Sequence, residues 1–570
     1  MIPETKYNLR TATTVGLALL CAAYPARSQD NDENDVHTLD KFVVVANRYE
    51  VAIDKVGSSV EILESYDLEK GNQFFLLDFM REVPGFYVRN NGGPGGTFGI
   101  TTRGLNSNRP TVLIDGIKVS NPASGQIINF GNLYGSNISR VEILKGPQSS
   151  LYGADALAGV ISIQTNTDSP GGRIELSAGS FDTYEASFGF NGNEEPFHWS
   201  FNASRYDSNG FSSQPPSFGP EWADDDAYEN TSFSTNLGYQ LNDDSELFFI
   251  AYYIDSFSEF DPGTPAPWLT NPNPDNYSKN EQLFAKLGGK FQILDNWNSQ
   301  ISVAHSDVDT ISFTGFAYAS DGDRYEFDWQ NTIEFSERWT MVAGAEYELE
   351  DNRTDIGDRD NQSYYIENVL PLSDQLNWTM GARYDDNSAY GDETTWRSSF
   401  SYRIEAIDSR LHGSFGTSFQ APSFYQLFNP TYGNTTLTPE SGKGWDFGFE
   451  KTFADGRFVL NSTFFGYEID NKINFSFVTS RYANEEFYES EGVETSAIWQ
   501  LSDAFRFKVC HTYSEANYED GTEAERVPRN LYSLNANWRG FQNRLGINAT
   551  LLHVSSQLGL RNATTRQPGY

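Results

Sequence analysis

The chain has 570 residues with 78 acidic and 40 basic side chains, so its formal net charge at pH 7 is −38. A charge of that sign argues against a phosphate-backbone partner, and we expect no nucleic-acid binding. Aromatic residues make up 15% of the chain although its mean hydropathy is −0.53. A strand with one face toward lipid and the other toward water can be rich in aromatic residues and still have a low mean hydropathy, because apolar and polar residues alternate along it.

Residues 1–28 are predicted to form a secretory signal peptide. Lys6 and Arg10 supply its positive start, an apolar run follows at residues 14–23, and Ala26-Arg27-Ser28 offers a cleavage site. The apolar run is too short to cross a bilayer as a helix, and no later stretch approaches about 18 apolar residues. A chain integral to a membrane would therefore have to cross it as a β-barrel.

Residues 29–50 are expected to form a flexible N-terminal segment. Its first part, residues 30–40, is acidic and polar, a composition typical of mobile chain. Residues 40–46 then bring a β-branched run, and such an extended run can add as a strand to the sheet edge of a partner protein. The alternative is that residues 40–46 form an ordinary first strand of the domain that follows.

Residues 51–168 are predicted to form a small α+β domain. A helix is expected at residues 76–82, and apolar strands are expected at residues 112–114 and 141–144. The glycine cluster at residues 92–96 lacks the lysine and hydroxyl side chain of a phosphate-binding loop.

Residues 169–570 consist of alternating segments of about ten residues separated by turn residues, the pattern of a membrane β-barrel. In one segment Phe233 and Leu237 share a face opposite Ser232 and Ser234. We expect the apolar face to meet lipid and the polar face to line the lumen. A soluble β-sandwich also alternates, but its strands are usually nearer about five residues long.

The connections between these segments alternate in length. Tight turns are expected at residues 241–244 and 454–456, and long polar loops at residues 208–230, 256–279 and 351–363. Short turns at one end and long loops at the other are typical of an outer-membrane barrel.

We expect no enzymatic site. The six histidines show no metal-ligand spacing, and neither a GxSxG elbow nor a phosphate-binding loop is present. Cys21 falls in the expected signal peptide, which leaves Cys510 alone in the mature chain, so no disulfide is expected.

Several motifs resemble, in order and spacing, the plug domain of TonB-dependent receptors. They are Val83-Pro84-Gly85-Phe86, Arg103-Gly104, Val112-Leu113-Ile114-Asp115-Gly116, Arg140-Val141-Glu142-Ile143-Leu144-Lys145-Gly146-Pro147, Leu151-Tyr152-Gly153 and Ala158-Gly159-Val160-Ile161. Phe419-Gln420-Ala421-Pro422 and Leu437-Thr438-Pro439-Glu440 resemble the barrel signature of the same family. The resemblance implies a 22-stranded antiparallel β-barrel with the α+β plug in its lumen, which actively imports a scarce nutrient across the outer membrane of a Gram-negative bacterium.

Within that family the likeness is greatest to receptors for cobalamin (vitamin B12), on the run Asn91-Gly92-Gly93 and on residues 381–388. The resemblance implies a corrinoid ligand, and a ferric siderophore or another metal chelate is the alternative. By position, the ligand-contacting residues would be Thr97, Gly99, Asn106, Ser124, Gly125 and Arg526. The alternative for these residues is that they only form turns.

The resemblance also implies partners. The TonB box, which binds the TonB protein of the inner-membrane energy-coupling complex, would be Asp40, Lys41, Phe42, Val43, Val44, Val45 and Ala46. Arg103, Arg140 and Glu142 are expected to dock the plug against the barrel wall, or else only to solubilise the plug surface. The receptor is expected to be a monomer surrounded by outer-membrane lipids.

Calcium is the one cofactor that we expect, in the extracellular loops. Hard oxygen ligands could come from Asp224, Asp225, Asp226, Asp255 and Asp261. Cobalamin receptors order their loops with calcium at a similar place, although this chain has no acidic match around residues 210–213. A solvated acidic loop is the alternative.

The alternating segments between residues 173 and 555 number about 19, whereas bacterial single-chain barrels have an even number of strands. In related receptors a stretch similar to Gln567-Pro568-Gly569-Tyr570 introduces a further strand. We therefore expect that about 40–60 residues, enough for three more strands, are missing at the C-terminus through a truncated reading frame or an incomplete sequence. The alternative is a barrel that closes at a smaller even number.

Overall fold

The computed structural model describes residues 42–64, 74–93, 95–105, 109–165, 170–213, 225–261, 276–314, 317–354, 357–454, 456–542, 544–559 and 566–570. By its internal contacts the chain divides into residues 1–35 and residues 36–570, and every described residue belongs to the second unit. The expected signal peptide therefore lies outside the described residues. No described helix is long and apolar enough to cross a membrane.

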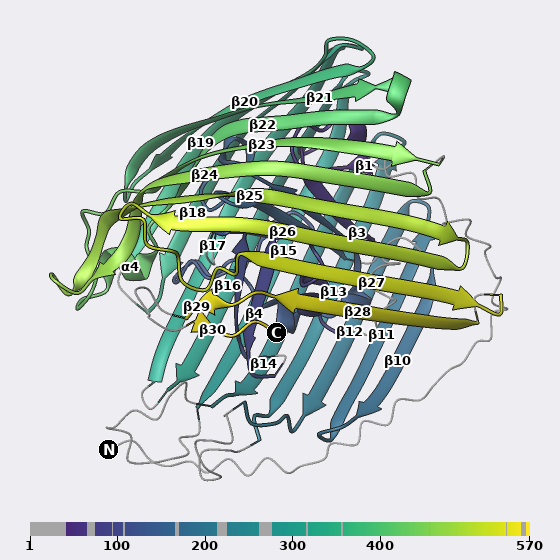
Figure 1. The fold of residues 1–570 in the computed structure, drawn as a ribbon. Helices are drawn as coiled ribbons and strands as arrows, with labels where there is room; N and C mark the ends of the chain where they lie inside the picture. The colour runs from purple at the N-terminus through teal and green to yellow at the C-terminus, as the bar shows by residue number, and fades with distance from the viewer. Residues whose placement is uncertain are drawn as a thin grey trace. The chain divides into compact units, whose positions relative to one another are not determined.

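One antiparallel sheet of 19 strands, β10–β28, forms a wall that curls around the N-terminal elements (Figure 1). Each strand pairs with its neighbours in sequence, and β10 and β28 are the two edges. The predicted count of about 19 strands is confirmed, whereas the expected C-terminal extension stays a prediction. The strands are β10 Gly171–Gly179, β11 Thr183–Glu194, β12 Phe197–Ser208, β13 Tyr228–Asn242, β14 Ser245–Glu259, β15 Tyr277–Leu294, β16 Trp297–Phe313, β17 Ala317–Ser336, β18 Trp339–Asn352, β19 Gly357–Pro371, β20 Leu376–Asn387, β21 Gly391–Ile404, β22 Ser409–Gln420, β23 Glu440–Phe453, β24 Phe458–Ser476, β25 Arg481–Ser502, β26 Phe505–Tyr518, β27 Asn530–Gly540 and β28 Leu545–Val554.

Most wall strands are longer than the ten residues predicted, and β25 has 22. The predicted loop at residues 351–363 is wrong for this reason, because β18 ends at Asn352 and β19 begins at Gly357. The outward-facing residues Asp358 and Asp360 of β19 are polar. The strand therefore extends beyond the segment in which outward-facing residues are apolar. The predicted tight turn at residues 241–244 is confirmed, since β13 pairs with β14 up to Asn242 and Ser245.

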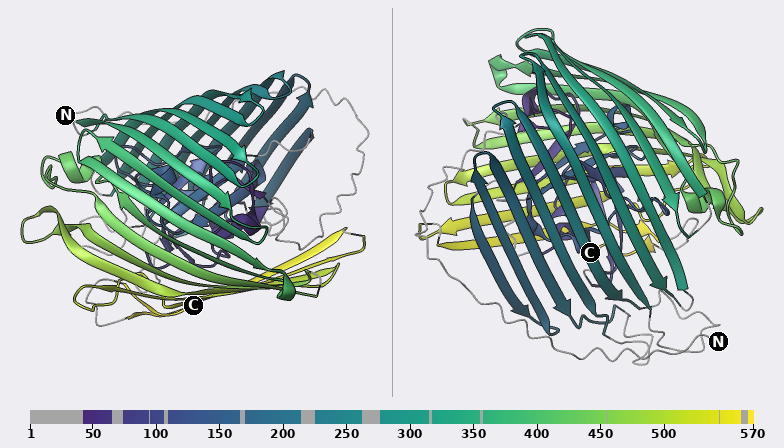
Figure 2. Two further views of the ribbon diagram at one scale, coloured as in Figure 1. Left: turned by 90° about the horizontal axis from the view of Figure 1, so that it is seen from above. Right: turned by 180° about the vertical axis from the view of Figure 1, so that it is seen from behind.

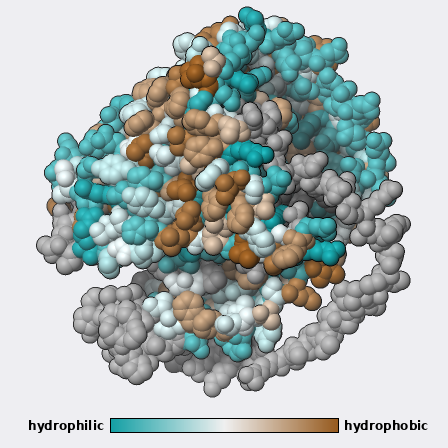
Figure 3. Space-filling view, turned by 45° about the vertical axis from the view of Figure 1, so that its right-hand side comes forward, coloured by the Kyte–Doolittle hydropathy of each residue, from teal (hydrophilic) through white to brown (hydrophobic). Residues whose placement is uncertain are grey.

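Side chains of the wall strands alternate between an outward apolar face and an inward polar face, as predicted. On β13, Phe233 is 52% exposed whereas Ser232 and Ser234 are buried. On β16, Val303 is exposed and its neighbour Ser302 is buried. Figure 3 shows hydrophobic side chains gathered across the middle of one face, with hydrophilic ones toward its upper end. A paired backbone with an apolar outer surface suits a lipid bilayer.

The N-terminal elements form a plug domain inside the curl of the wall (Figure 2). The predicted α+β class is confirmed, with a five-stranded sheet in the order β3-β8-β9-β6-β7. The predicted helix and both predicted strands match α2, β6 and β8. The plug elements are β1 Phe42–Val43, β2 Val51–Ala52, η2 Ile53–Lys55, β3 Val60–Glu64, α2 Leu76–Met80, β4 Phe86–Asn91, β5 Thr97–Thr102, β6 Pro110–Ile114, β7 Ile117–Lys118, η3 Phe130–Asn132, η4 Gly135–Asn137, β8 Ile138–Lys145, α3 Ser149–Tyr152 and β9 Gly159–Thr165. Short later elements are η7 Glu405–Ile407, α4 Phe424–Phe428, β29 Gln557–Leu558 and β30 Arg566–Gln567.

Residues 42–50 are packed into the plug, and the expectation that they belong to a flexible segment is wrong. Strand β1 pairs with β2, and Val43, Val45 and Ala46 are buried in a cluster with Tyr152. Burial of each such aliphatic side chain contributes roughly 1–3 kcal/mol, enough to hold a short segment in place.

The outward placement of Val303, near the middle of β16, yields a prediction. Val303→Arg is expected to destabilise the barrel folded in lipid vesicles by about 2–4 kcal/mol, because a cation would face hydrocarbon. The folded fraction would be followed by heat-resistant migration on electrophoresis during a urea titration. Gln300→Arg, on the inward face of the same strand, is the control and should change folding little. Equal losses from both substitutions would contradict the assignment of faces.

Candidate functional site

Two cavities lie between the plug and one part of the wall, strands β12–β17. The outer cavity, of about 420 Å³, meets Asn280 and Gln282 near the start of β15, at the wall end that carries the long connections. The inner cavity, of about 470 Å³, meets Lys286 and Lys290 farther along β15, toward the wall end with short turns. Inward positions of one strand thus line both cavities, with the buried Phe284 between the two sets.

The plug side of the outer cavity is built by glycines, β5 and a compact turn. The Asn121 side-chain oxygen accepts hydrogen bonds from the backbone N–H of Ala123 (2.9 Å) and of Ser124 (3.2 Å). The Gly125 N–H donates to the Asn121 carbonyl (2.8 Å), and Gly125 has φ +68°, which favours glycine there. This turn holds Ser124 and Gln126 at the cavity.

Every described side chain that lines the outer cavity is neutral. From the wall come hydroxyl and amide groups, among them Asn280, Gln282 and Thr310, and from the plug come Asn121 and Asn129. Apolar surface is added by Phe98, Val119, Ile127, Ile128, Val308 and Phe260. A cavity of this kind binds a ligand through neutral hydrogen bonds and apolar contact, whereas a buried anion would find no counter-charge on these residues.

The structure brings together only some of the predicted ligand contacts. Gly99 and Ser124 line the outer cavity, and the backbone of Thr97 begins β5 beside it. Gly125 lines a neighbouring space of about 30 Å³. Asn106 lies outside the described residues.

Arg526 is not among the described residues that line the outer cavity, and its contact with the ligand stays a prediction. Its backbone N–H donates to the Leu558 carbonyl (2.7 Å), and its charge acts on Arg89 of the plug. The loop between β26 and β27 therefore holds it away from the lining of strands β14–β17.

Sequence reasoning missed the wall residues of the outer cavity, which include Asn280, Gln282, Thr310, Tyr318 and Ser320. Polar residues at alternate positions of neighbouring strands were the available signal. That pattern gives the inward face but not the depth at which each residue lies.

The predicted calcium ligands are partly brought together. The Ser213 N–H donates to Asp261 (2.7 Å) and lies 3.3 Å from Asp226, so these two carboxylates converge. Asp255 lies on the outward face of β14 with Tyr253, away from that pair, and its assignment is corrected by strand alternation. Asp225 is exposed, and Asp224 lies outside the described residues.

A different carboxylate group, Asp307, Asp309 and Asp321, has metal-like spacing among the described residues. Arg353 contacts Asp307 (2.6 Å) and Asp309 (2.7 Å), and it also pairs with Asp321. The guanidinium therefore supplies the counter-charge there.

Arg103 joins the plug to the wall, at the position predicted for docking. Its guanidinium is buried and bonds to Glu494 of β25 (2.9 Å), which also accepts from Lys145 (3.0 Å). Asp446 of β23 lies 3.6 Å away. Burial alone would lower the pKa of the Arg103 guanidinium, but the Glu494 carboxylate beside it raises that pKa, so the residue stays charged.

Arg140 and Glu142 do not dock the plug against the wall, and that prediction is wrong for both. Glu142 accepts from the backbone N–H of Val44 (2.9 Å) and of Val45 (2.8 Å). Arg140 bonds to Glu142 (2.9 Å) and to the Phe42 carbonyl. The reason is that β8 lies beside the N-terminal segment, whose free amide groups satisfy the buried carboxylate.

The same N-terminal segment is also bound to the wall. Arg48 pairs with Glu346 (2.5 Å) and Asp328 (3.1 Å). Asn47 donates to Glu367 (2.6 Å), and Arg397 donates to the Ala46 carbonyl (3.1 Å). Phe42–Ala46 of the predicted TonB box is thus held between plug and wall, while Asp40 and Lys41 lie outside the described residues.

Residues 167–570 match the family described as "TonB dependent receptor-like, beta-barrel", and residues 52–160 match the "TonB-dependent Receptor Plug Domain". A vitamin B12 transporter BtuB from Photobacterium profundum is 27% identical, over 81% of this chain and 75% of its own length. Another BtuB, from Vibrio vulnificus, is 26% identical over 92% and 86%.

Solved structures share the fold at lower identity. The pyoverdine receptor FpvA of Pseudomonas aeruginosa has a TM-score of 0.77 at 16% identity, with 92% of this chain and 87% of that chain covered. A ferric enterobactin receptor PfeA mutant of the same species has a TM-score of 0.76 at 17% identity, with 90% of each chain covered.

The Arg103 contact yields a prediction about how the plug is seated. Glu494→Ala should destabilise the plug by about 3–5 kcal/mol, because Arg103 and Lys145 lose their shared carboxylate. Faster amide hydrogen exchange in β4 and β5 would report the loss. The control is Glu229→Ala, which removes an exposed partner of Arg205 and should cost less than about 1 kcal/mol. Unchanged exchange in Glu494→Ala would contradict a seating role.

Proposed function

The chain belongs to the TonB-dependent receptor family, and from that premise we propose that it imports cobalamin or a related corrinoid across the outer membrane. TonB-dependent transport in an outer membrane is the activity of the family. The long-loop end of the wall then faces the outside of the cell, and the short-turn end faces the periplasm. The similar BtuB proteins support the choice of ligand.

The observation that carries this proposal is the neutral lining of the outer cavity. Cobalamin is neutral overall and has amide groups around an extended ring system, so Asn, Gln, Ser and Thr side chains can exchange hydrogen bonds with it. Ferric catecholate siderophores are anions, and a site for them would gain from arginine or lysine. Similarity to siderophore receptors is evidence for the fold alone.

Energy coupling is proposed to act through the N-terminal segment. Residues 40–46 would pair as a strand with TonB, which requires the backbone N–H of Val44 and Val45 to leave Glu142. We also propose that residues 1–28 are a signal peptide and that the receptor is a monomer.

Calcium is proposed for the loops that follow β12 and β14. Asp226 and Asp261 converge there and offer hard oxygen ligands, with Asp224 and Asp225 adjacent in sequence. Binding of Ca²⁺ by these loops would fix the rim of the outer cavity.

The ligand proposal is tested by calorimetry with cobalamin and, in parallel, with ferric enterobactin. Ser124→Trp should weaken cobalamin binding at least about tenfold, because the indole would fill the outer cavity. Asp374→Trp, in an exposed turn between β19 and β20, is the control and should bind normally. Binding of the ferric chelate alone would reverse the choice of ligand.

Coupling is tested by Val44→Pro, which removes a donor needed for the added strand and should abolish uptake while cobalamin still binds. The matched control is Glu142→Ala. It loosens the same segment but keeps its backbone donors, and it should still transport. Normal uptake by Val44→Pro would remove the TonB-box assignment, and loss of uptake in both variants would attribute the effect to docking.

A further inference from the structure

The hairpin of β6 and β7 lies beside both cavities, because Gly116 and Lys118 line the inner one and Val119, which follows β7, lines the outer one. Its turn, Asp115-Gly116, has φ values of +47° and +77°, as a two-residue hairpin requires. Contacts of Gly116 and Lys118 hold it to the wall. Lys286 donates to the Gly116 carbonyl (3.0 Å), Ser306 donates to the Lys118 carbonyl (3.0 Å), and Lys118 pairs with Glu348 (2.7 Å).

Charges in the inner cavity are mostly paired, but two lysines are not. Arg48 pairs with Asp328, and Lys118 pairs with Glu326 (3.3 Å) as well as Glu348. Within the described part of the chain, Lys286 is 8% exposed and has one hydrogen bond, to Gly116, without any ion pair. Lys290 lies over the Phe248 ring (5.7 Å), likewise without a carboxylate partner in these ranges.

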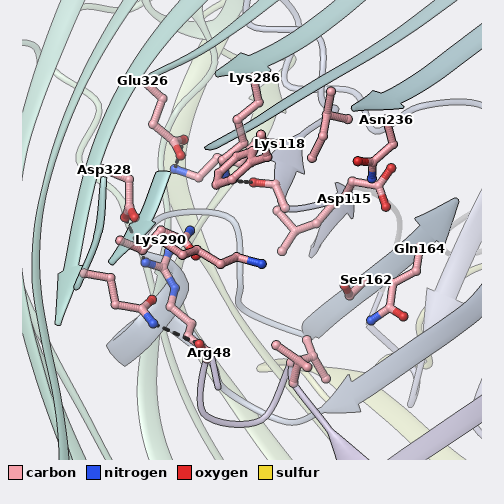
Figure 4. A pocket seen from close by; sticks show the side chains of 18 of the residues that line it. Arg48, Asp115, Lys118, Ser162, Gln164, Asn236, Lys286, Lys290, Glu326 and Asp328 are labelled. Carbon is pink, nitrogen blue, oxygen red and sulfur yellow. Dashed lines mark hydrogen bonds and ion pairs between the residues drawn. The ribbon is translucent and has the colours of Figure 1, made fainter. Parts of the chain in front are cut away.

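Figure 4 shows how these groups surround the cavity. Lys286, Lys290, Glu326 and Asp328 come from the wall, and Asp115, Ser162 and Gln164 come from the plug. Lys286 is a buried ammonium with a single neutral hydrogen-bond partner, which is unfavourable unless an anion joins it. Lys290 is exposed and lines the same cavity, so the two lysines together mark a place for a negative group.

We propose that the inner cavity is a transit site for the imported ligand and that the β6–β7 hairpin is the gate between it and the outer cavity. The inference rests on the proposed function. Lys286 and Lys290 would take an anionic group, which for cobalamin is its phosphodiester. The outer cavity then binds the neutral amide periphery, and the inner cavity receives the phosphate as the ligand descends along β15.

The position of the N-terminal segment links this route to energy input. Val44, Val45 and Arg48 line the inner cavity. When that segment is displaced, the cavity widens toward the periplasm and Arg48 leaves Asp328. Elsewhere the plug meets the wall through buried pairs such as Arg103–Glu494.

Charge substitutions at Lys286 test the transit site. Lys286→Gln keeps a donor for the Gly116 carbonyl but loses the charge, so cobalamin should bind at the cell surface as before while uptake falls about tenfold. Lys286→Arg should restore uptake. Native uptake by Lys286→Gln would overturn the transit site alone. Absence of cobalamin binding by the unmodified receptor would instead overturn the proposed function, and with it the ligand named here.

Thiol labelling tests the side on which the route opens. In a Cys510→Ser background, Asn236→Cys lies at the inner cavity, and Ser399→Cys lies buried on β21 against Gly57 of the plug. A maleimide too large for porins, added outside energised cells with ligand, should label Asn236→Cys and leave Ser399→Cys unlabelled. Equal labelling, or labelling of Ser399→Cys alone, would overturn the route.

Discussion

Buried ion pairs between the plug and the inward face of the wall are the interaction on which the rest of the structure depends. The lumen is polar because the outer face of each strand is apolar, so the plug must present charge to it. Arg103 and Lys145 share Glu494, and Arg109 pairs with Glu440. Each pair is stable only while complete, since removal of one partner leaves an uncompensated charge. Once opened and wetted, however, both partners regain solvent, so such an interface can separate and reform.

These ion pairs are unevenly distributed around the lumen, so one side of the plug is held to the wall more strongly than the other. Strands β13–β16 meet the plug largely through neutral bonds, such as Tyr228 to the Gly131 carbonyl (2.8 Å) and Asn230 to the Asn132 carbonyl (3.2 Å). Both large cavities involve this side. A neutral contact costs little to break, because each such hydrogen bond contributes only about 0.5–1.5 kcal/mol. The charged side therefore seats the plug while the neutral side can yield.

Local pattern predicted the wall and the plug, whereas the site depended on contacts that pattern does not encode. Alternation on β13 and the apolar strand β8 follow from neighbouring residues alone. That Asn280 and Ser124 line one cavity depends on strand register and on plug depth, which no local signal carries. The errors differ in kind. Asp255 could have been excluded by its alternation with Tyr253, but the contacts of Glu142 with the N-terminal segment required the structure.

The N-terminal segment is bound to both bodies at once, and this determines how a pull on it is transmitted. Glu142 of the plug holds Val44 and Val45, while Arg397 and Glu367 of the wall hold Ala46 and Asn47. A force applied from the N-terminus loads these bonds one after another. The energy needed at each step is therefore the small energy of a single hydrogen bond. The plug contacts come first and the Arg48 pairs come last. Because Val44, Val45 and Arg48 also line the inner cavity, the bonds that yield are those that enclose the space a ligand would enter.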